Sequence, residues 1–170
     1  MSQDELSGPD LDGVVADANA VGLKYVVIGG FSVIANGFLR ATKESDLLVP
    51  DGPETDEAIG RFLERSQATR LYDGKKLTRE DIAGAQHLRV NSLHDIVDLM
   101  RGGLPPLDYD TVAERALRVE LGDRQAPVAD LRSIVGFKRL ANRPRDQYDL
   151  KELEAFHGAL PIEHIPGLDT

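Results

Sequence analysis

The stretch that decides the fold is "RATKESDLLVP", residues 40–50, in which two carboxylates stand at the start of an apolar strand. Alternate side chains of a strand share a face, so Glu44 and Asp46 point one way while Ser45 and Leu47 point the other. Neighbouring carboxylates repel and raise each other's pKa unless a proton or a cation compensates their charge, which favours a divalent metal site. The alternative interpretation is a solvated entrance to the strand.

An apolar run upstream of this stretch ends in a pair of glycines. The segment "KYVVIGG", residues 24–30, predicts a short strand closed by Gly29 and Gly30, followed by a short helix. Backbone N–H groups at such a turn can approach a phosphate, although a tight turn without a ligand also takes glycine. A phosphate-binding turn beside a carboxylate pair is what Mg²⁺-dependent phosphoryl or nucleotidyl transfer requires.

The remaining N-terminal pattern alternates between helices and short strands. Helical spacing predicts a helix over residues 11–22, with Gly22 as its C-cap, and a second long helix beginning near Pro53. Residues 86–93 and 95–100 are typical of two adjoining strands. The sequence therefore predicts an α/β (α+β) fold, with a short mixed sheet flanked by helices.

The residue composition of the chain changes at "RGGLPPLDYD", residues 101–110, where glycines and paired prolines predict a loop between two parts of the chain. We place a boundary there, between a core of residues 1–103 and a C-terminal part of residues 104–170. Two helices separated near Asn142 are expected in the second part, with Asp130 as the N-cap of the first. A small helical C-terminal part is thus expected to complete the cleft.

Composition limits the classes of function. The chain has 170 residues, no cysteine and a formal net charge of −9, which argues against binding nucleic acid by charge alone. Its acidic beginning lacks the regions of a signal peptide, and no apolar run is long enough to span a bilayer. We therefore expect a cytoplasmic protein without a membrane partner. The four histidines show no metalloprotease spacing.

Two blocks of sequence carry a resemblance to a known family. "IGGFSVIANGFLRATKESDLLV" resembles the signature of the DNA polymerase β type nucleotidyltransferase superfamily, a glycine turn followed by two acidic residues one apart on a strand. "LRSIVGFKRLANRPRDQYDLKEL" is similar to the tail of its small bacterial branch of AbiEii-type and MenT-type toxins. Together the blocks extend from Lys24 to Leu153, and they imply a minimal nucleotidyltransferase core.

The resemblance also implies roles for individual residues. A third carboxylate is expected on a neighbouring strand, where Asp98 is the best match and Asp95 the second. Glu44 departs from the family, which normally has aspartate at this position. The residues implied are Glu44, Asp46 and Asp98 as metal ligands, Lys138 and Asp146 as further catalytic groups, and Gly29, Gly30, Arg40, Thr42, Lys138 and Arg143 on the nucleotide side.

Each of these residues also has a plainer interpretation. Asp98 can be a structural aspartate at a sheet edge, and Lys138 a surface lysine whose stem lies along its helix. Arg143 and Arg145 can bridge to Asp146 or Asp149 instead of meeting a nucleic-acid acceptor. These alternatives stay open at the level of the sequence.

The resemblance implies an activity as well as a fold. It implies Mg²⁺-dependent transfer of a nucleoside monophosphate from an NTP to an acceptor hydroxyl. The acceptor implied first is RNA, at the acceptor end of tRNA. The protein would then be the toxin of a toxin–antitoxin pair, with a protein antitoxin as its partner. Transfer to a protein side chain or to a small molecule such as an aminoglycoside is the competing enzymatic reading. A degenerate nucleotide-binding or interaction module, in which Glu44 marks lost catalysis, is the non-enzymatic one.

Overall fold

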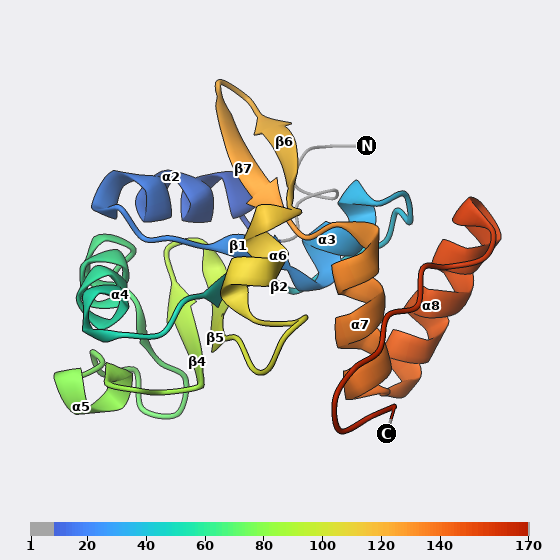
Figure 1. The fold of residues 1–170 in the computed structure, drawn as a ribbon. Helices are drawn as coiled ribbons and strands as arrows, with labels where there is room; N and C mark the ends of the chain where they lie inside the picture. Colours follow the sequence, from blue (N-terminus) through green and yellow to red (C-terminus); the bar gives the residue numbers. More distant parts are fainter. Residues whose placement is uncertain (1–8, 170) are drawn as a thin grey trace.

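The computed structural model describes residues 9–169 (Figure 1). The first eight residues, which contain most of the acidic segment considered for a signal peptide, lie outside the described part. The helices are α2 (Leu11–Val21), α3 (Gly29–Ala35), α4 (Pro53–Arg65), α5 (Arg79–Ile82), α6 (Tyr109–Glu114), α7 (Leu131–Ala141) and α8 (Pro144–His157). The strands are β1 (Val26–Ile28), β2 (Glu44–Val49), β3 (Thr69–Arg70), β4 (His87–Ser92), β5 (Asp95–Arg101), β6 (Leu117–Leu121) and β7 (Arg124–Val128).

The strands form one seven-stranded mixed sheet in the order β3-β4-β5-β2-β1-β7-β6. Strand β2 runs parallel to β5 and antiparallel to β1, and β1 in turn runs parallel to β7. The strands and helices expected in the N-terminal half are present, and so is the predicted class, a short mixed sheet flanked by helices. The core domain and the C-terminal part share this sheet, and their boundary near residue 103 stays a prediction.

Period-two alternation divides the core between the two faces of the sheet. On one face, Val27 and Leu47 pack with α2 and α4, whose Phe62 is fully buried. On the other face, Ile28 and Leu48 pack with residues of α3, α6, α7 and α8. Glu44 and Asp46 share the strand parity of Leu48, so β2 directs their carboxylates to the side of the sheet where α3 and the C-terminal helices lie.

The β6–β7 hairpin was not predicted. Residues 117–128 form two antiparallel strands joined at Gly122 and Asp123, and β7 adds the hairpin to the sheet through the pair Val27–Val128. In Figure 1 the hairpin rises above the sheet, next to α2. The C-terminal part therefore contributes strands to the sheet as well as the two expected helices, α7 and α8, and Asp130 caps α7 by accepting from the Ser133 amide at 2.9 Å.

The segment after α8 lies back along α7, as Figure 1 shows. Arg115 donates to Glu163 at 2.8 Å, and Arg139 of α7 donates to Asp169 at 2.5 Å.

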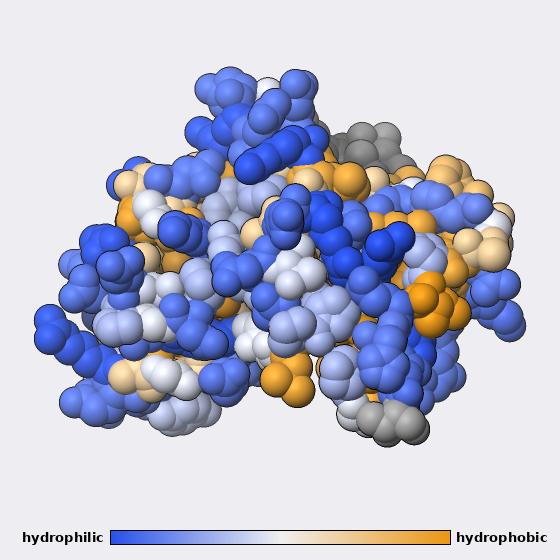
Figure 2. Space-filling model, viewed as in Figure 1, coloured by the Kyte–Doolittle hydropathy of each residue, from blue (hydrophilic) through white to orange (hydrophobic). Residues whose placement is uncertain are grey.

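Among residues 9–169, no helix is both long and apolar enough to cross a membrane. On the face drawn in Figure 2, hydrophilic side chains predominate and hydrophobic ones form small separate groups.

Candidate active site

Three carboxylates meet where β2 and β5 lie side by side. The parallel register sets Asp46 directly beside Asp98, and Glu44 lies one pleat earlier on β2. Oxygen atoms of the three side chains lie within 4.8 Å of one another. Asp95, the second candidate from the sequence, sits at the exposed start of β5 outside this group. The structure thus brings together the three residues that the sequence singled out as metal ligands.

The crowding of these carboxylates changes their affinity for protons. Burial, a hydrogen bond to Asp98 and the charges of Asp98 and Glu44 raise the pKa of Asp46 to about 8. The pKa of Asp98 is lowered, because hydrogen bonds from Arg89, Asp46 and His87 outweigh the effect of burial. The cluster therefore holds a proton at neutral pH in the place where a cation would relieve the same repulsion.

The donor set fits a divalent metal ion such as Mg²⁺. Three carboxylates from two adjacent strands supply the hard oxygen ligands that Mg²⁺ prefers, and their mutual repulsion gives a cation a favourable place. Glu44, Asp46 and Asp98 are the residues that would hold it. The glutamate side chain at position 44 reaches the other two carboxylates in spite of its extra methylene.

The glycine turn is required by its neighbours. Gly29 begins α3 with φ +69°, and a Cβ there would lie 1.9 Å from Oδ2 of Asp46. A Cβ on Gly30 would lie 2.4 Å from Oγ1 of Thr42, which itself donates to the Glu44 carbonyl at 3.2 Å. Both glycines are therefore needed for the turn to pack against the carboxylate strand, and their role toward a phosphate remains a proposal.

A second group of charges joins the C-terminal helices to the core. Lys138 is buried and lies 2.7 Å from Asp149 and 3.1 Å from Asp146. Arg40, from the loop before β2, forms a two-bonded pair with Asp149 at 2.8 and 2.9 Å. Arg143 donates to Asp146 at 2.7 Å. Hydrogen bonds from Arg143 and Lys138 outweigh burial and lower the pKa of Asp146 to about 2.

Asp149 was missed by the sequence analysis as a site residue. It is fully buried between Arg40 and Lys138. Its spacing of three from Asp146 on a helix was the available signal, because residues three apart share a helix face. Its charge was nevertheless not assigned, since nothing in the sequence shows that the loop before β2 reaches α8.

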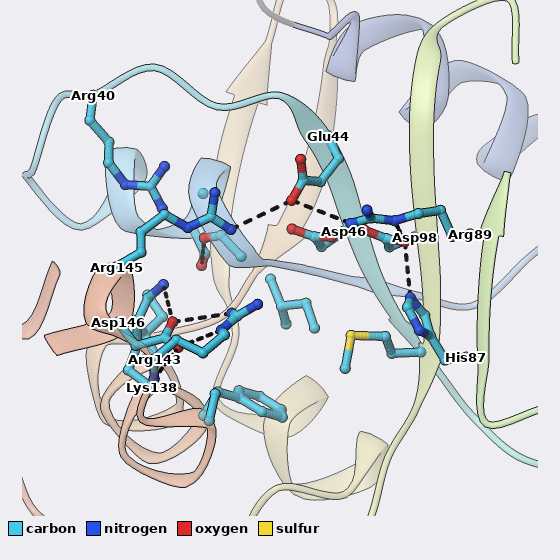
Figure 3. Close-up of a pocket in the computed structure, with 18 residues that line it drawn as sticks. Arg40, Glu44, Asp46, His87, Arg89, Asp98, Lys138, Arg143, Arg145 and Asp146 are labelled. Atoms are coloured by element: carbon cyan, nitrogen blue, oxygen red, sulfur yellow. Dashed lines mark hydrogen bonds and ion pairs between the residues drawn. The ribbon is translucent and has the colours of Figure 1, made fainter. Parts of the chain in front are cut away.

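A cleft of about 370 Å³ lies between the two charged groups (Figure 3). Nine predicted site residues line it, and Thr42, which is not among the lining residues, lies next to Gly30. Arg89 and His87 also line it, and both contact Asp98. The predicted lining residues are Gly29, Gly30, Arg40, Glu44, Asp46, Asp98, Lys138, Arg143 and Asp146, and an apolar wall is added by Ile28, Met100, Ile134 and Phe137.

We predict that Gly29→Ala destabilises the protein by more than about 1–2 kcal/mol, because the left-handed backbone disfavours a side chain and the added Cβ meets the Asp46 carboxylate. Gly60→Ala is the matched control, since Gly60 lies inside α4 with open space at its Cβ position. That control should gain about 0.5–1 kcal/mol. Urea unfolding measures both changes, and a Gly29→Ala protein as stable as the wild type would contradict this packing.

We also predict that Asp46→Asn stabilises the protein in EDTA, and increasingly so as the pH rises. Between pH 3.8 and about 8 the folded chain keeps the Asp46 proton that the unfolded chain has lost, so wild-type stability falls across this window. The gain for the variant should rise by at most about 1.4 kcal/mol per pH unit and level off above pH 8. Urea unfolding at pH 5 and 8.5 tests this, with exposed Asp123→Asn as control.

Comparisons with known proteins place this geometry in a fold. No protein-family model matches the chain, and no curated protein matches it either. The chain is similar to the solution structure of the antibiotic-resistance factor ANT(2″)-Ia, with a TM-score of 0.56 and 12% identity over 87% of this chain and 82% of that one. It is also similar to the crystal structure of ANT(2″)-Ia in complex with adenylyl-2″-tobramycin, with a TM-score of 0.51 and 14% identity over 86% and 83% of the two chains. The chain therefore has the expected nucleotidyltransferase fold.

Proposed function

We propose that this protein is a divalent-metal-dependent nucleotidyltransferase that moves a nucleoside monophosphate from an NTP to an acceptor hydroxyl. The observation that carries the proposal is the meeting of Glu44, Asp46 and Asp98 at the floor of a cleft, beside the Gly29 turn. The fold shared with ANT(2″)-Ia supports the same class of reaction.

The two walls of the cleft have different tasks in this proposal. A bound Mg²⁺ would supply Lewis acidity toward the phosphate oxygens and the acceptor hydroxyl. On the opposite wall, among the residues that the structure describes, the three cations Arg40, Lys138 and Arg143 pair with the two carboxylates of Asp146 and Asp149. This group therefore has one positive charge in excess, which suits a triphosphate and the pyrophosphate that leaves. Arg145, which also lines the cleft, lies 3.6 Å from Glu44.

Lys138 acts in this scheme through charge and position. Its side chain is 7% exposed and its ammonium group is held by two buried carboxylates, so its place in the cleft wall is fixed. Arg143 reaches the solvent with 62% of its side chain exposed, and it can turn toward a phosphate while Lys138 keeps Asp146 in place. Arg143 is therefore the more exposed of these two nucleotide-side cations.

We propose a small hydroxylated molecule of the aminoglycoside kind as the first acceptor to test. The cleft volume of about 370 Å³ falls in the range of small-molecule sites. ANT(2″)-Ia, which shares the fold, is seen in complex with adenylyl-2″-tobramycin. The shared fold therefore puts a small-molecule acceptor first among the candidates to test.

The acceptor end of tRNA is the second candidate, and the AbiEii-type and MenT-type resemblance supports it. Arg143 and Arg145 at the start of α8 have 62% and 49% of their side chains exposed at the cleft, where a polyanion would meet them. In this version the protein is the toxin of a toxin–antitoxin pair and a protein antitoxin covers the cleft. A protein side chain is the remaining acceptor class.

Transfer of label identifies the acceptor and tests the reaction. Purified protein is incubated with Mg²⁺ and each α-labelled NTP, together with an aminoglycoside panel, total tRNA or total protein. We predict label in the small-molecule fraction and its loss of at least about 10³-fold in Asp46→Asn, which removes a metal ligand at nearly constant volume. Asp123→Asn, with 92% of its side chain exposed, is the matched control and should keep full activity.

The outcomes of this experiment separate the hypotheses. Label in tRNA would move the proposal to the toxin version, and label in protein would name the third acceptor class. A folded protein that labels none of the three, with any NTP, would overturn the enzymatic proposal and leave a degenerate nucleotide-binding module.

Glu44 provides a second test, because the wild-type side chain is one methylene longer than the usual aspartate. Its carboxylate already reaches Asp46 and Asp98, so Glu44→Asp withdraws it by about 1.5 Å. We predict a fall in kcat on the order of 10²-fold, the scale of a 1 Å misplacement, and a similar or larger fall for Glu44→Gln. Steady-state transfer rates of the wild type and the two variants measure these changes. A faster Glu44→Asp enzyme would mean that Glu44 marks a site with partly lost catalysis.

A further inference from the structure

Arg89 contacts the same carboxylates that would hold the metal. It lies on β4 directly across from Asp98 of β5, so the strand register itself sets the pair. Its Nε donates to Oδ1 and its Nη2 to Oδ2 of Asp98, both at 2.8 Å. The same Nη2 atom lies 3.6 Å from Oε1 of Glu44. Figure 3 shows Arg89 above Asp98, on the opposite side of the cleft from Arg143.

The acceptor capacity of Asp98 is taken up by these contacts. An ionised carboxylate offers about four lone-pair positions. Arg89 uses two of them, His87 Nε2 lies 2.9 Å from Oδ1, and Asp46 shares a further hydrogen bond with Asp98. A divalent ion that binds Asp98 must therefore displace or share with one of these partners.

The Arg89 pair is not a requirement of the hydrophobic core. Its side chain is 46% exposed, and it lines the cleft instead of filling a buried space. A guanidinium group keeps its charge at every physiological pH, and this one is further favoured by Asp98 and Glu44, which raise its pKa. Arg89 thus places a permanent positive charge on two of the three candidate ligands.

We propose that Arg89 is an internal counter-cation of the metal site, which competes with the divalent ion for Asp98 and Glu44. It stabilises the carboxylate cluster when no ion is bound, and it lowers the affinity of the site for the ion. This inference rests on the proposed function only in taking the three carboxylates as the metal site. It adds Arg89 as a residue that sets metal affinity, and Arg89 is not part of the family signature that the sequence resembles.

Mn²⁺ binding without nucleotide tests the proposal directly. The free Mn²⁺ signal in electron paramagnetic resonance gives the dissociation constant for the wild type and for Arg89→Gln. We expect Arg89→Gln to bind Mn²⁺ at least about tenfold more tightly, because a positive charge next to the ion has been removed. Arg124→Gln is the matched control, since it removes an arginine of the β6–β7 hairpin that pairs with exposed Asp12 of α2, and it should leave Mn²⁺ affinity unchanged.

Arg89→Lys separates charge from shape. Lysine keeps the positive charge but cannot bridge both oxygens of Asp98. We expect its Mn²⁺ affinity to stay within about threefold of the wild type, since charge is the competing element. A gain in Arg89→Lys as large as that in Arg89→Gln would overturn the counter-cation role.

Thermal melting supplies a readout that a purely structural role would not reproduce. In EDTA, Arg89→Gln should melt at a lower temperature than the wild type, because the carboxylates have lost their compensating charge. Saturating Mn²⁺ should raise its melting temperature by more than it raises that of the wild type. If Arg89 only held Asp98 in position, Arg89→Gln would bind Mn²⁺ more weakly, and equal or weaker binding by the folded variant refutes the proposal. None of these measurements needs nucleotidyl transfer, so a failure of the transfer assay is seen separately.

Discussion

The parallel pairing of β2 with β5 is the constraint on which the rest of the site depends. It sets Asp46 beside Asp98, a pair of like charges in a partly buried place. The neighbouring elements are adapted to this pair. Gly29 leaves room for the Asp46 carboxylate, and Arg89 of the neighbouring strand β4 forms an ion pair with Asp98. Such a cluster of repelling charges supports the proposed metal site.

The second wall of the cleft depends on a different kind of contact. Asp149 of α8 ties the loop before β2, through Arg40, to Lys138 of α7. These buried pairs lie beside the apolar contacts that α7 and α8 make with the sheet. Burying charges costs desolvation energy, so their presence supports a demand for fixed charge positions at the cleft over a demand for stability alone.

Local periodicity explains what the sequence could predict. The alternation around Glu44 and Asp46 is a property of one strand, and Asp98 interrupts an apolar run within one strand, so both were visible in the residues themselves. Arg89 became important only through its register with Asp98, and Asp149 only through a contact 109 residues away. The 117–128 hairpin did have a local signal, alternating residues around the Gly122 turn, which the neighbouring helical patterns concealed.

The order of the strands also bears on how the sheet meets other chains. At one edge, β3 is only two residues long and offers little free backbone. At the other edge, β6 exposes the charged side chains of Arg118 and Glu120. Short edge strands and edge charges are devices that oppose strand-to-strand aggregation. The hairpin that extends the sheet therefore also closes it, because it places a charged strand where the central strand β1 would otherwise present an apolar edge.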